Sequence, residues 1–387
     1  MSETVVPTHI RCMLWGKAAG RCQYRGCNEI LHIDPNTKSL MNRSYIAHIV
    51  ADSPGGPRGD KVLSPKLAKD ISNLMLLCDT HHRLIDVNDV AGHPVELLQA
   101  MKQEHEQRIE LVTQIQEDRQ SQIVLYGSNI GDHSYPISYE RAVVALLPER
   151  YPADSRAIEL GWKNSLYNDH EEDYWKIENE NLKRQVQSKL MPLLTSGARR
   201  HISLFALAPQ PLLISLGTML SDIFPVDVYQ LQREPVQKWG WDNESDDIEF
   251  HIQSPEKIHR TVALNISLSA TIENNRITEV LGENVSVWTL TIKNPNNDFM
   301  KSKSHLSAFR QTIRKLMDGI KSVHGQDNRL NIFPAMAVST AVELGRVWMP
   351  KADLPLVIYD QNKKTNKFEL ALEIYKNNEV VLQGNAV

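Results

Sequence analysis

Apolar and polar positions follow different patterns in the two parts of this chain. From about residue 141 onward, short apolar runs of strand length alternate with longer runs that have helical spacing. Residues 201–208 form a nearly continuous apolar run, which is typical of a strand buried on both faces of a parallel sheet. A proline and a predicted helix over 212–223 follow this strand, and the same order returns over 329–348. The pattern predicts an α/β fold for the second part.

Further segments of the second part fit the same alternation. Runs of strand length cover 226–232, 261–270, 285–292 and 354–362, and runs with helical spacing cover 172–192 and 305–324. The segment FALAPQPLLISLG (205–217) is similar to IFPAMAVSTAVELG (332–345), which indicates a weak internal duplication. We therefore expect two α/β halves, whose strand-to-helix turns line one crevice.

The first part of the chain has short elements separated by loops. The segments that predict structure are a helix near 13–20, strands over 29–33 and 43–50, a loop over 52–61 and a long helix over 94–115. The turn-rich residues between the two strands predict a hairpin. Residues 73–86 are expected to begin in a helix-like run and to end in a helix. The polar, turn-rich residues 116–140 predict a linker, so we expect domains over 1–115 and 141–387.

Composition narrows the chemistry of the first part. All four cysteines lie within the first 78 residues, and such clustering in an intracellular chain favours a metal site over disulfides. The net charge of −4 gives no support to a generally basic nucleic-acid binder. The chain has no apolar run long enough for a membrane span, and its first residues do not have the pattern of a secretory signal. We therefore expect a cytoplasmic protein that does not contact membranes.

The cysteine spacing predicts a structural zinc site. Cys22 and Cys27 form a C-x4-C pair, and Cys78 and His81 form a C-x2-H pair. Two short turns of this kind close the tetrahedron of sulfur and nitrogen ligands that zinc prefers. The alternative is that these are small core residues whose spacing is unrelated. Cys12 is left over and is expected to be a buried thiol.

The neighbouring histidine has a separate candidate role. His82 and Asp86 are four residues apart, so they share one face of the predicted helix. An imidazole and a carboxylate there can bind a hard divalent ion such as Mg²⁺ or Mn²⁺. The alternative is an ordinary pair on a helix surface.

The order of these motifs resembles an HNH endonuclease of the zinc-stapled ββα-metal type over about residues 10–110. The elements that carry the resemblance are Cys22, Cys27, AHI (47–49), GGPRG (55–59), NLMLLC (73–78) and the two histidines with Asp86. The resemblance implies that His48 is the general base, that Asn73 orients the segment of this histidine, and that His82 is a metal ligand. A neutral imidazole can take a proton from water, and the ion then stabilises charge on the phosphate.

One position departs from the family pattern. Many members carry an aspartate or a histidine directly before the general base, as a second metal ligand, and here that residue is Ala47. Asp86 is the first candidate to replace it, and Asp52 and Asp34 are others. Arg58 is expected either to hold a phosphate or to pair with an acid on the surface.

The second part resembles a SAVED domain over roughly 140–387. The motifs are FALAPQPLLISLG (205–217), VDVYQLQREPVQKWGW (226–241) and the segment from 332 to 360. The resemblance implies two CARF-like halves of Rossmann type that sense a cyclic oligonucleotide. The order HNH then SAVED is similar to effectors of CBASS anti-phage defence in bacteria. In these effectors a cyclic dinucleotide or trinucleotide drives homo-oligomerisation and switches on cleavage of double-stranded DNA.

A ligand crevice is also predicted from the residues themselves. Helix N-termini after the two prolines attract phosphates, and aromatic and basic side chains nearby can contact bases and phosphates. The candidates are Pro209, Gln210, Arg233, Lys238, Trp239, Pro334 and Arg346, with Tyr229, Trp241 and Trp348 as further aromatic residues. The alternative for each is a core aromatic or a surface charge.

Three functions are consistent with the sequence. The first is a cyclic-oligonucleotide-activated, metal-dependent DNA endonuclease with structural zinc and catalytic Mg²⁺ or Mn²⁺. The second is a ligand-responsive, zinc-containing DNA-binding regulator without catalysis, which Ala47 favours. The third is a nuclease that cuts RNA and has the same sensor.

Overall fold

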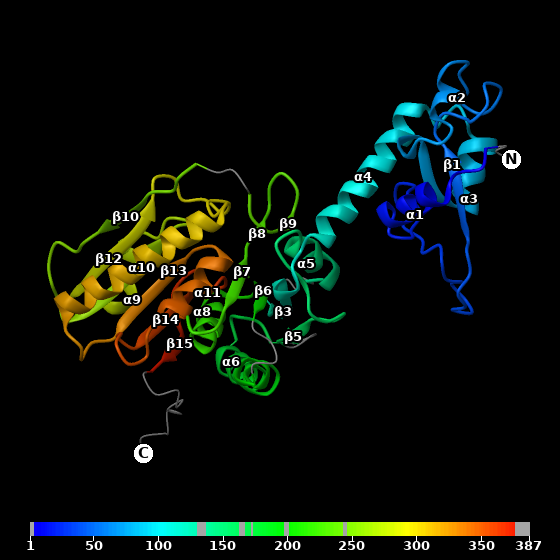
Figure 1. Ribbon diagram of the computed structural model, residues 1–387. Coiled ribbons are helices and arrows are strands. Elements are labelled where there is room, and N and C mark those ends of the chain that lie inside the picture. The colour runs from blue at the N-terminus through cyan, green and yellow to red at the C-terminus, as the bar shows by residue number, and fades with distance from the viewer. Residues whose placement is uncertain are drawn as a thin grey trace. The chain divides into compact units, whose positions relative to one another are not determined.

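The computed structural model describes residues 4–129, 137–161, 167–171, 173–196, 201–242 and 246–375. The chain divides into two compact units, residues 1–117 and 118–387 (Figure 1). Among the described helices, none combines the length and the apolar composition that a membrane span needs.

The first unit is built on two antiparallel strands. Its elements are α1 (Thr8–Lys17), β1 (Ser44–His48), α2 (Leu63–Leu67), the 3₁₀ helix η1 (Ile71–Asn73), β2 (Leu74–Cys78), α3 (Asp79–Arg83), the π-helical segment η2 (Leu84–Asn88) and α4 (Val95–Thr113). β1 pairs with β2 so that Ser44 lies opposite Cys78 and His48 lies opposite Leu74. The long helix expected over 94–115 is present as α4.

The hairpin expected between 29–33 and 43–50 is wrong. Residues 21–40 make only two isolated bridges, Arg21 with Ile30 and Ile33 with Leu40, and β1 pairs instead with β2. The segment 74–78 is a strand and is not helix-like. All five of its residues are buried, and an apolar run of this length does not distinguish a buried strand from a buried helix.

The second unit contains two sheets. The first sheet has the order β4-β3-β6-β7 with β5 also on β3, and all its strands are parallel. Its strands are β3 (Gln120–Gly127), β4 (Tyr151–Pro152), β5 (Ile158–Leu160), β6 (Ile202–Leu207) and β7 (Val226–Tyr229). The helices in this half are η3 (Glu117–Arg119), α5 (Tyr139–Leu146), α6 (Tyr174–Gln185), the π-helical segment η4 (Val186–Leu190), α7 (Met191–Thr195) and α8 (Gln210–Leu220).

The second sheet has the order β10-β12-β11-β13-β14-β15, with antiparallel strands at both edges. Its strands are β10 (Phe250–Gln253), β11 (Thr261–Ser267), β12 (Val285–Ile292), β13 (Leu330–Ala335), β14 (Leu356–Gln361) and β15 (Phe368–Ile374). The helices in this half are α9 (Asn274–Leu281), α10 (Lys303–His324) and α11 (Val338–Val347), and a small separate pair is formed by β8 (Leu231–Gln232) and β9 (Lys238–Trp239).

The linker expected over 116–140 is wrong for residues 120–127. These residues form β3, which pairs with β6 on one side and with β4 and β5 on the other. Its apolar run covers only 123–126 and follows the polar residues Gln120 and Ser121, although residues 121–126 are all buried. Residues 130–136 lie outside the described residues.

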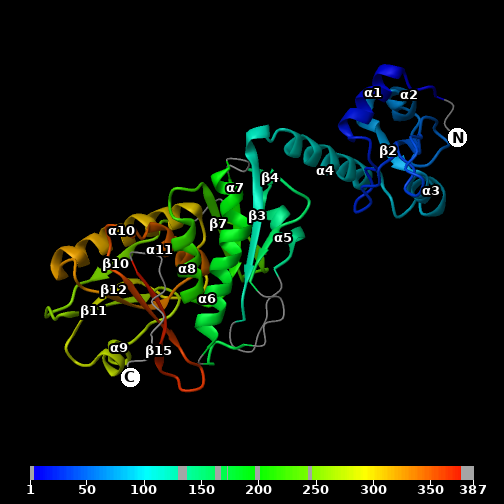
Figure 2. The same ribbon diagram turned by 90° about the horizontal axis from the view of Figure 1, so that it is seen from below.

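The repeated sequence corresponds to a repeated unit of strand, turn and helix, β6–α8 and β13–α11. The two helices pack against each other between the two sheets, α8 contacting β14 and β15 and α11 contacting β6 and β7 (Figure 2). A Cβ atom on Gly217 would lie 2.1 Å from the carbonyl oxygen of Val342, and one on Gly345 would lie 2.0 Å from that of Ile214. The reciprocal contacts show that the helices cross at their glycines with approximate two-fold symmetry.

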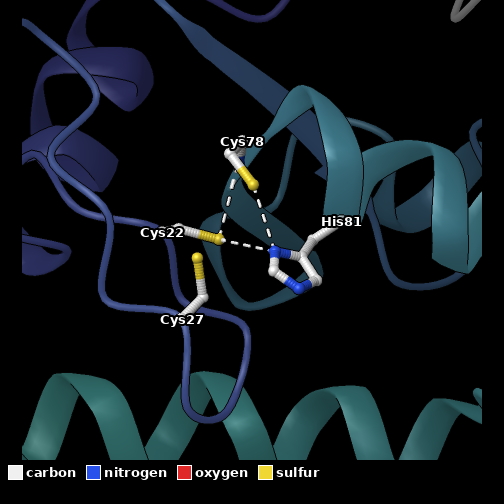
Figure 3. Close-up of side chains that lie close together, drawn as sticks. All are labelled: Cys22, Cys27, Cys78 and His81. Atoms are coloured by element: carbon white, nitrogen blue, oxygen red, sulfur yellow. Dashed lines mark hydrogen bonds between the residues drawn. The ribbon is translucent and has the colours of Figure 1, made fainter. Parts of the chain in front are cut away.

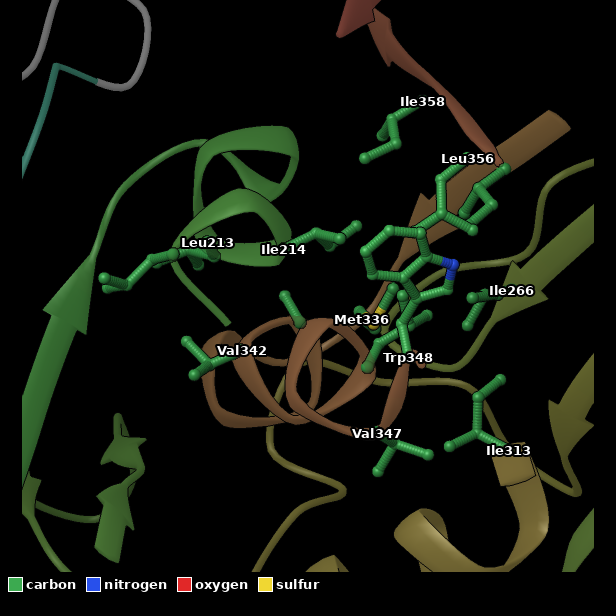
Figure 4. Close-up of a cluster of buried hydrophobic side chains, with 14 of the residues drawn as sticks. Leu213, Ile214, Ile266, Ile313, Met336, Val342, Val347, Trp348, Leu356 and Ile358 are labelled. Carbon is green, nitrogen blue, oxygen red and sulfur yellow. The ribbon is translucent and has the colours of Figure 1, made fainter. Parts of the chain in front are cut away.

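Apolar side chains from both halves form one core around this crossing. Figure 4 shows Leu213 and Ile214 of α8 near Val342 of α11, with Trp348 beside them. The indole nitrogen of Trp348 donates to the carbonyl oxygen of Leu354 at 2.9 Å, so the ring is both buried and hydrogen-bonded. The second unit therefore behaves as one body with two related halves.

Candidate functional site

The first unit brings three cysteines and a histidine together. Cys22 and Cys27 lie in the loop after α1, Cys78 ends β2, and His81 lies in α3, and their ligand atoms are all within 4.8 Å of one another (Figure 3). The Nδ1 atom of His81 is 3.1 Å from the Sγ of Cys78 and 3.8 Å from that of Cys22. The four residues that the spacing singled out therefore face one point. In the residues that the structure describes, this is the one such cluster of three or more histidine, cysteine or acidic side chains.

Backbone contacts fix the cysteine loop on β2. The backbone N–H of Gln23 donates to the carbonyl oxygen of Leu76 at 2.9 Å, and the side-chain oxygen of Gln23 accepts from the N–H of Leu76 at 2.8 Å. The ring of Tyr24 stacks on that of His81 with centroids 4.1 Å apart. These contacts hold the loop and the start of α3 in register, so the site does not depend on long flexible side chains.

Burial of the cluster favours the neutral forms of its side chains when no cation is bound. Burial raises the pKa of the Cys22 and Cys78 thiols, and burial lowers the pKa of His81. A divalent cation offsets this cost because it stabilises the thiolate forms. Tetrahedral zinc places neighbouring ligand atoms about 3.4 to 3.8 Å apart, which the observed separations approach. The donor set and geometry thus fit a four-coordinate zinc ion. Cys12, expected to be a buried thiol, is exposed.

His48 is fixed in one orientation at the end of β1. Its Nε2 atom lies 2.9 Å from the carbonyl oxygen of Ala68, and the residue is 7% exposed. A carbonyl oxygen only accepts hydrogen bonds, so Nε2 carries the proton and the neutral ring has its lone pair on Nδ1. This tautomer is the one that a general base needs.

Asn73 holds the backbone that follows His48. Its side-chain oxygen accepts from the N–H of Val50 at 2.8 Å, and its side-chain nitrogen donates to the carbonyl oxygen of Val50 at 2.8 Å. A longer bond of 3.3 Å joins the same nitrogen to the carbonyl oxygen of Leu67. The side chain thus bonds the residue before β2 to the backbone that follows β1 in both directions.

His82 and Asp86 form a pair on the following helical segment. The Nε2 atom of His82 is 3.4 Å from Oδ2 of Asp86, and the His82 ring stacks on Tyr45 with centroids 4.8 Å apart. Burial lowers the pKa of His82, against the opposing effect of the Asp86 and Asp79 carboxylates. A neutral imidazole nitrogen and a carboxylate oxygen at this separation can share one divalent cation, whose neighbouring ligands lie about 3 Å apart in octahedral geometry.

Arg58 is buried beside this pair and does not face solvent. Its side chain is 6% exposed, and it donates to Oδ1 of Asp86 at 2.5 Å. It also donates to the carbonyl oxygens of Ile49 at 2.7 Å, Ile85 at 2.6 Å and His48 at 3.3 Å. The guanidinium therefore ties the end of β1 to the segment of Asp86. This arrangement opposes the phosphate-binding role considered for Arg58.

The other candidates for the missing metal ligand are engaged elsewhere. Oδ1 of Asp34 accepts from the N–H groups of Asn36 and Thr37, and Oδ2 of Asp52 accepts from the N–H of Thr4. Ala47 is buried, and strand alternation places it on the same face of β1 as Tyr45 and on the face opposite His48. Among the described residues, no hydrogen bond or ion pair joins the His48 ring to His82 or Asp86; Arg58 is the link between them.

The second unit has a small crevice where strand ends of the two halves meet. A cavity of about 50 Å³ is lined by residues that include Leu207, Gln230, Arg233, Ser269 and Met336. Leu207, Gln230, Ser269 and Met336 end or follow strands of the two sheets, so the cavity lies at the carboxyl ends of parallel strands, the usual ligand position in α/β folds.

Two glutamines of the first half reach across this crevice. The side-chain oxygen of Gln230 accepts from the N–H of Ser339 at 3.2 Å and from its hydroxyl at 2.7 Å. The side-chain oxygen of Gln210 accepts from the N–H of Met336 at 3.2 Å. Gln210 was predicted for the crevice but is not among its lining residues, whereas Gln230 lines it and was missed. Its position inside the run VDVYQLQ, where a polar residue interrupts an apolar strand, is the signal that could have identified it.

The remaining predicted ligand residues differ in position. Arg233 lines the crevice, Pro209 precedes α8, and Pro334 is buried in β13. The ligand role expected for Arg346 is wrong. Arg346 is 3% exposed, pairs with Glu343 at 2.7 Å, and donates to three backbone carbonyl oxygens near the start of β7. The ion pair and these backbone hydrogen bonds occupy the guanidinium, so it is not available to a ligand.

The aromatic candidates are core residues or lie apart from the crevice. Trp239 is buried with its ring edge-on to Phe205, and the ring of Tyr229 stacks on Phe205. Trp348 belongs to the main core. Lys238 is exposed and pairs with Asp242 at 3.1 Å. Trp241 lines a different cavity, together with Tyr229 and Lys303. The base-stacking role expected for these aromatic residues is therefore wrong for Trp239 and Trp348.

The second unit is an α/β domain with a crevice at the carboxyl ends of its parallel strands. The family model of the SMODS-associated and fused to various effectors sensor domain, SAVED, matches residues 182–374. That part of the chain is a SAVED domain. The match begins within α6, so β3 and α5 precede it although β3 belongs to the first sheet.

Solved structures with a similar arrangement include Cap4 receptors. One from Acinetobacter baumannii, a SAVED/CARF-domain containing receptor with the cyclic trinucleotide 2'3'3'-cAAA, is 11% identical with a TM-score of 0.44, over 72% of this chain and 55% of that chain. One from Moraxella osloensis is 11% identical with a TM-score of 0.39, over 72% of this chain and 59% of that chain. This chain thus spans less than two thirds of these proteins. No curated protein matches it in sequence.

Proposed function

We propose that this protein is a metal-dependent DNA endonuclease that a cyclic oligonucleotide activates, and that it acts as an anti-phage effector. The observation that carries the nuclease half is the arrangement of the first unit. His48 has its free lone pair on Nδ1, Asn73 braces the following backbone, and His82 and Asp86 lie together on the segment after β2. The order strand, strand, helix with these residues agrees with the resemblance to HNH endonucleases.

The residues have distinct tasks in the proposed reaction. His48 takes a proton from the attacking water at Nδ1, while its Nε2–H stays bonded to the carbonyl oxygen of Ala68 and holds the ring still. His82 and Asp86 would hold the divalent cation, and Arg58 orients Asp86 through its bond to Oδ1. Mg²⁺ or Mn²⁺ at this position supplies stabilisation of the charge that develops on the phosphate.

Zinc in the Cys22, Cys27, Cys78 and His81 cluster has a structural role in this proposal. The four donors come from the loop after α1 and from the end of β2 with α3, so one ion joins the elements that carry His82. A site with four protein ligands leaves no open position for substrate. His81 therefore anchors the start of α3, and its neighbour His82 is left for the second ion.

The sensor half rests on the SAVED match and on the crevice between the two halves. A ligand in the crevice can accept hydrogen bonds from backbone N–H groups near the start of α11. In the structure these N–H groups donate to the side chains of Gln210 and Gln230. Phosphate oxygens are stronger acceptors for such groups than an amide oxygen. Binding of a cyclic dinucleotide or trinucleotide then shifts the two halves and promotes homo-oligomerisation, which brings nuclease units together on DNA.

The choice of substrate is tested with purified full-length protein and Mg²⁺. Supercoiled plasmid and a single-stranded RNA are incubated with a panel of cyclic di- and trinucleotides, for wild type and His48→Ala. We expect plasmid cleavage by the wild type, and a rate about 10²- to 10⁴-fold lower for His48→Ala, the usual contribution of a general base. Cleavage of RNA alone would replace the DNA substrate in this proposal.

A second candidate function is a ligand-responsive DNA-binding regulator without catalysis. The observation in its favour is that Ala47 supplies no ligand and that Asp86 already pairs with Arg58. In that case the full-length protein binds duplex DNA more tightly when a cyclic nucleotide is present, and no strand is cut with Mg²⁺ or Mn²⁺.

A further inference from the structure

A second cavity of the sensor unit lies away from the crevice. It has a volume of about 530 Å³, within the range of small-molecule sites, and it is lined by α6, η4, α8 and the end of β15. Ile374 at the end of β15 pairs with Leu356, and Leu356 pairs with Leu330, the first residue of β13. The cavity therefore lies near the amino ends of the parallel strands, whereas the crevice lies at their carboxyl ends.

One face of α6 presents two donors to this cavity. Asn179 and Lys183 are one helical turn apart and both line it. Asn179 is 8% exposed, and its side-chain oxygen accepts from the hydroxyl of Ser215 at 2.7 Å. That bond fixes the amide, so its N–H groups are what remains for a ligand. Lys183 has neither a hydrogen bond nor an ion pair in the described structure, and burial lowers its pKa.

The positive charge of Lys183 is not cancelled by the acid on the opposite wall. Glu373 also lines the cavity, but it pairs with Arg329 at 3.3 Å and accepts from the hydroxyl of Tyr375 at 2.6 Å. Arg184, next to Lys183, is exposed and pairs with Glu180. A half-buried ammonium group beside a free amide therefore favours an anion.

The rest of the wall mixes apolar side chains with the polar Gln187, Ser188 and Thr218, and it is locally irregular. Val186, Met191 and Met219 face the cavity, and methionine side chains adapt to ligands of different shape. Val186 opens the π-helical segment η4, and such segments occur frequently at functional sites. The lining thus combines the donors of Asn179 and Lys183 with a group of apolar side chains that can contact an apolar part of a ligand.

We propose that this cavity is a second ligand site, for a small amphiphilic anion that carries a carboxylate or a phosphate monoester on an apolar group. The site goes beyond the proposed cyclic-oligonucleotide crevice and does not depend on it. Its walls come from α6 and α8 of one half and from β15 of the other, so a bound anion contacts both halves.

The test uses isothermal titration calorimetry on the full-length protein with 1-naphthyl phosphate, 1-naphthoate and the neutral 1-naphthol. We expect saturable binding of one or both anions and at least about tenfold weaker binding of the naphthol, because the charge-assisted bonds are lost. Lys183→Met is expected to weaken the anions by at least about tenfold. Met219→Trp is expected to abolish binding, because the indole fills the cavity. Lys176→Met, an exposed lysine of the same helix outside the lining, is the matched control and binds as the wild type.

The two anions separate the possible head groups, since the favoured class binds the wild type more tightly. Circular dichroism verifies that each variant is folded. The proposal is overturned if neither anion binds saturably, or if Lys183→Met or Met219→Trp binds like the wild type. It is also overturned if Lys176→Met loses affinity as strongly as Lys183→Met. Since the nuclease plays no part in the readout, failure here leaves the proposed function standing.

Discussion

Arg58 provides the sharpest distinction between a structural clamp and a DNA contact. Its guanidinium makes four hydrogen bonds, one to Asp86 and three to backbone carbonyl oxygens, and its side chain is 6% exposed. Arg58→Met keeps the length of the side chain but leaves the Asp86 carboxylate without its cation. Removing one partner of a buried pair costs about 3 to 5 kcal/mol. Because Asp86 is 22% exposed, we expect a lower cost, roughly 2 to 3 kcal/mol.

The measurement is a double-mutant cycle in urea with Arg58→Met, Asp86→Asn and the double variant, each loaded with zinc. We expect a coupling free energy of about 1 to 2 kcal/mol between the two residues. The salt dependence of DNA binding should be the same for Arg58→Met and wild type, because a buried clamp releases no counterion. A coupling below about 0.5 kcal/mol, together with a salt slope reduced by about one unit, would refute the clamp and restore the phosphate-binding role.

Three further predictions concern the other parts of the account. His81→Ala is expected to lose zinc and unfold the first unit, whereas His82→Ala stays folded and zinc-loaded but is inactive; zinc analysis and circular dichroism check both. Gly345→Ala is expected to destabilise the second unit by about 3 kcal/mol or more in urea, since its Cβ would lie 2.0 Å from a carbonyl oxygen; wild-type stability would contradict the close helix crossing. Burial alone raises the pKa of Asp227, but the hydrogen bond and charge of His201 lower it to about 2. The resulting stability is therefore present above about pH 4 and lost towards pH 2, and an acid titration should show a smaller loss of stability in Asp227→Asn than in the wild type.

The sequence predicted the elements whose pattern is local. The repeated order of strand, turn and helix marked β6–α8 and β13–α11, and the spacing of Cys22, Cys27, Cys78 and His81 named a cluster that the structure brings together. Each short turn supplies two metal ligands that are close together in sequence. The spacing of the ligands therefore indicates much of the geometry of the site. Asn73 differs from these residues, because its bonds to Val50 depend on the pairing of β1 with β2, which the sequence did not predict.

Long-range packing explains most of the errors. The sequence predicts a linker at β3 because the apolar run there is short and follows polar residues. The pairing of β3 with β6, which is distant in sequence, makes it a central strand. The sequence predicts that β1 pairs with residues 29–33, which are nearer along the chain. In the structure β1 pairs with the buried strand β2. Arg346 has the appearance of a phosphate ligand in sequence, but three carbonyl oxygens at the start of β7 take its donors. Patterns of residue type do not show which charges the fold itself neutralises.

Ligand dependence of DNA cleavage is the most direct test of the central claim. Full-length protein with Mg²⁺ is given supercoiled plasmid, with and without each cyclic di- or trinucleotide, while light scattering follows its size in solution. The account predicts little cleavage without ligand, and rapid cleavage together with an increase in mass for at least one cyclic nucleotide. Equal cleavage with and without every ligand, at an unchanged mass, would contradict it.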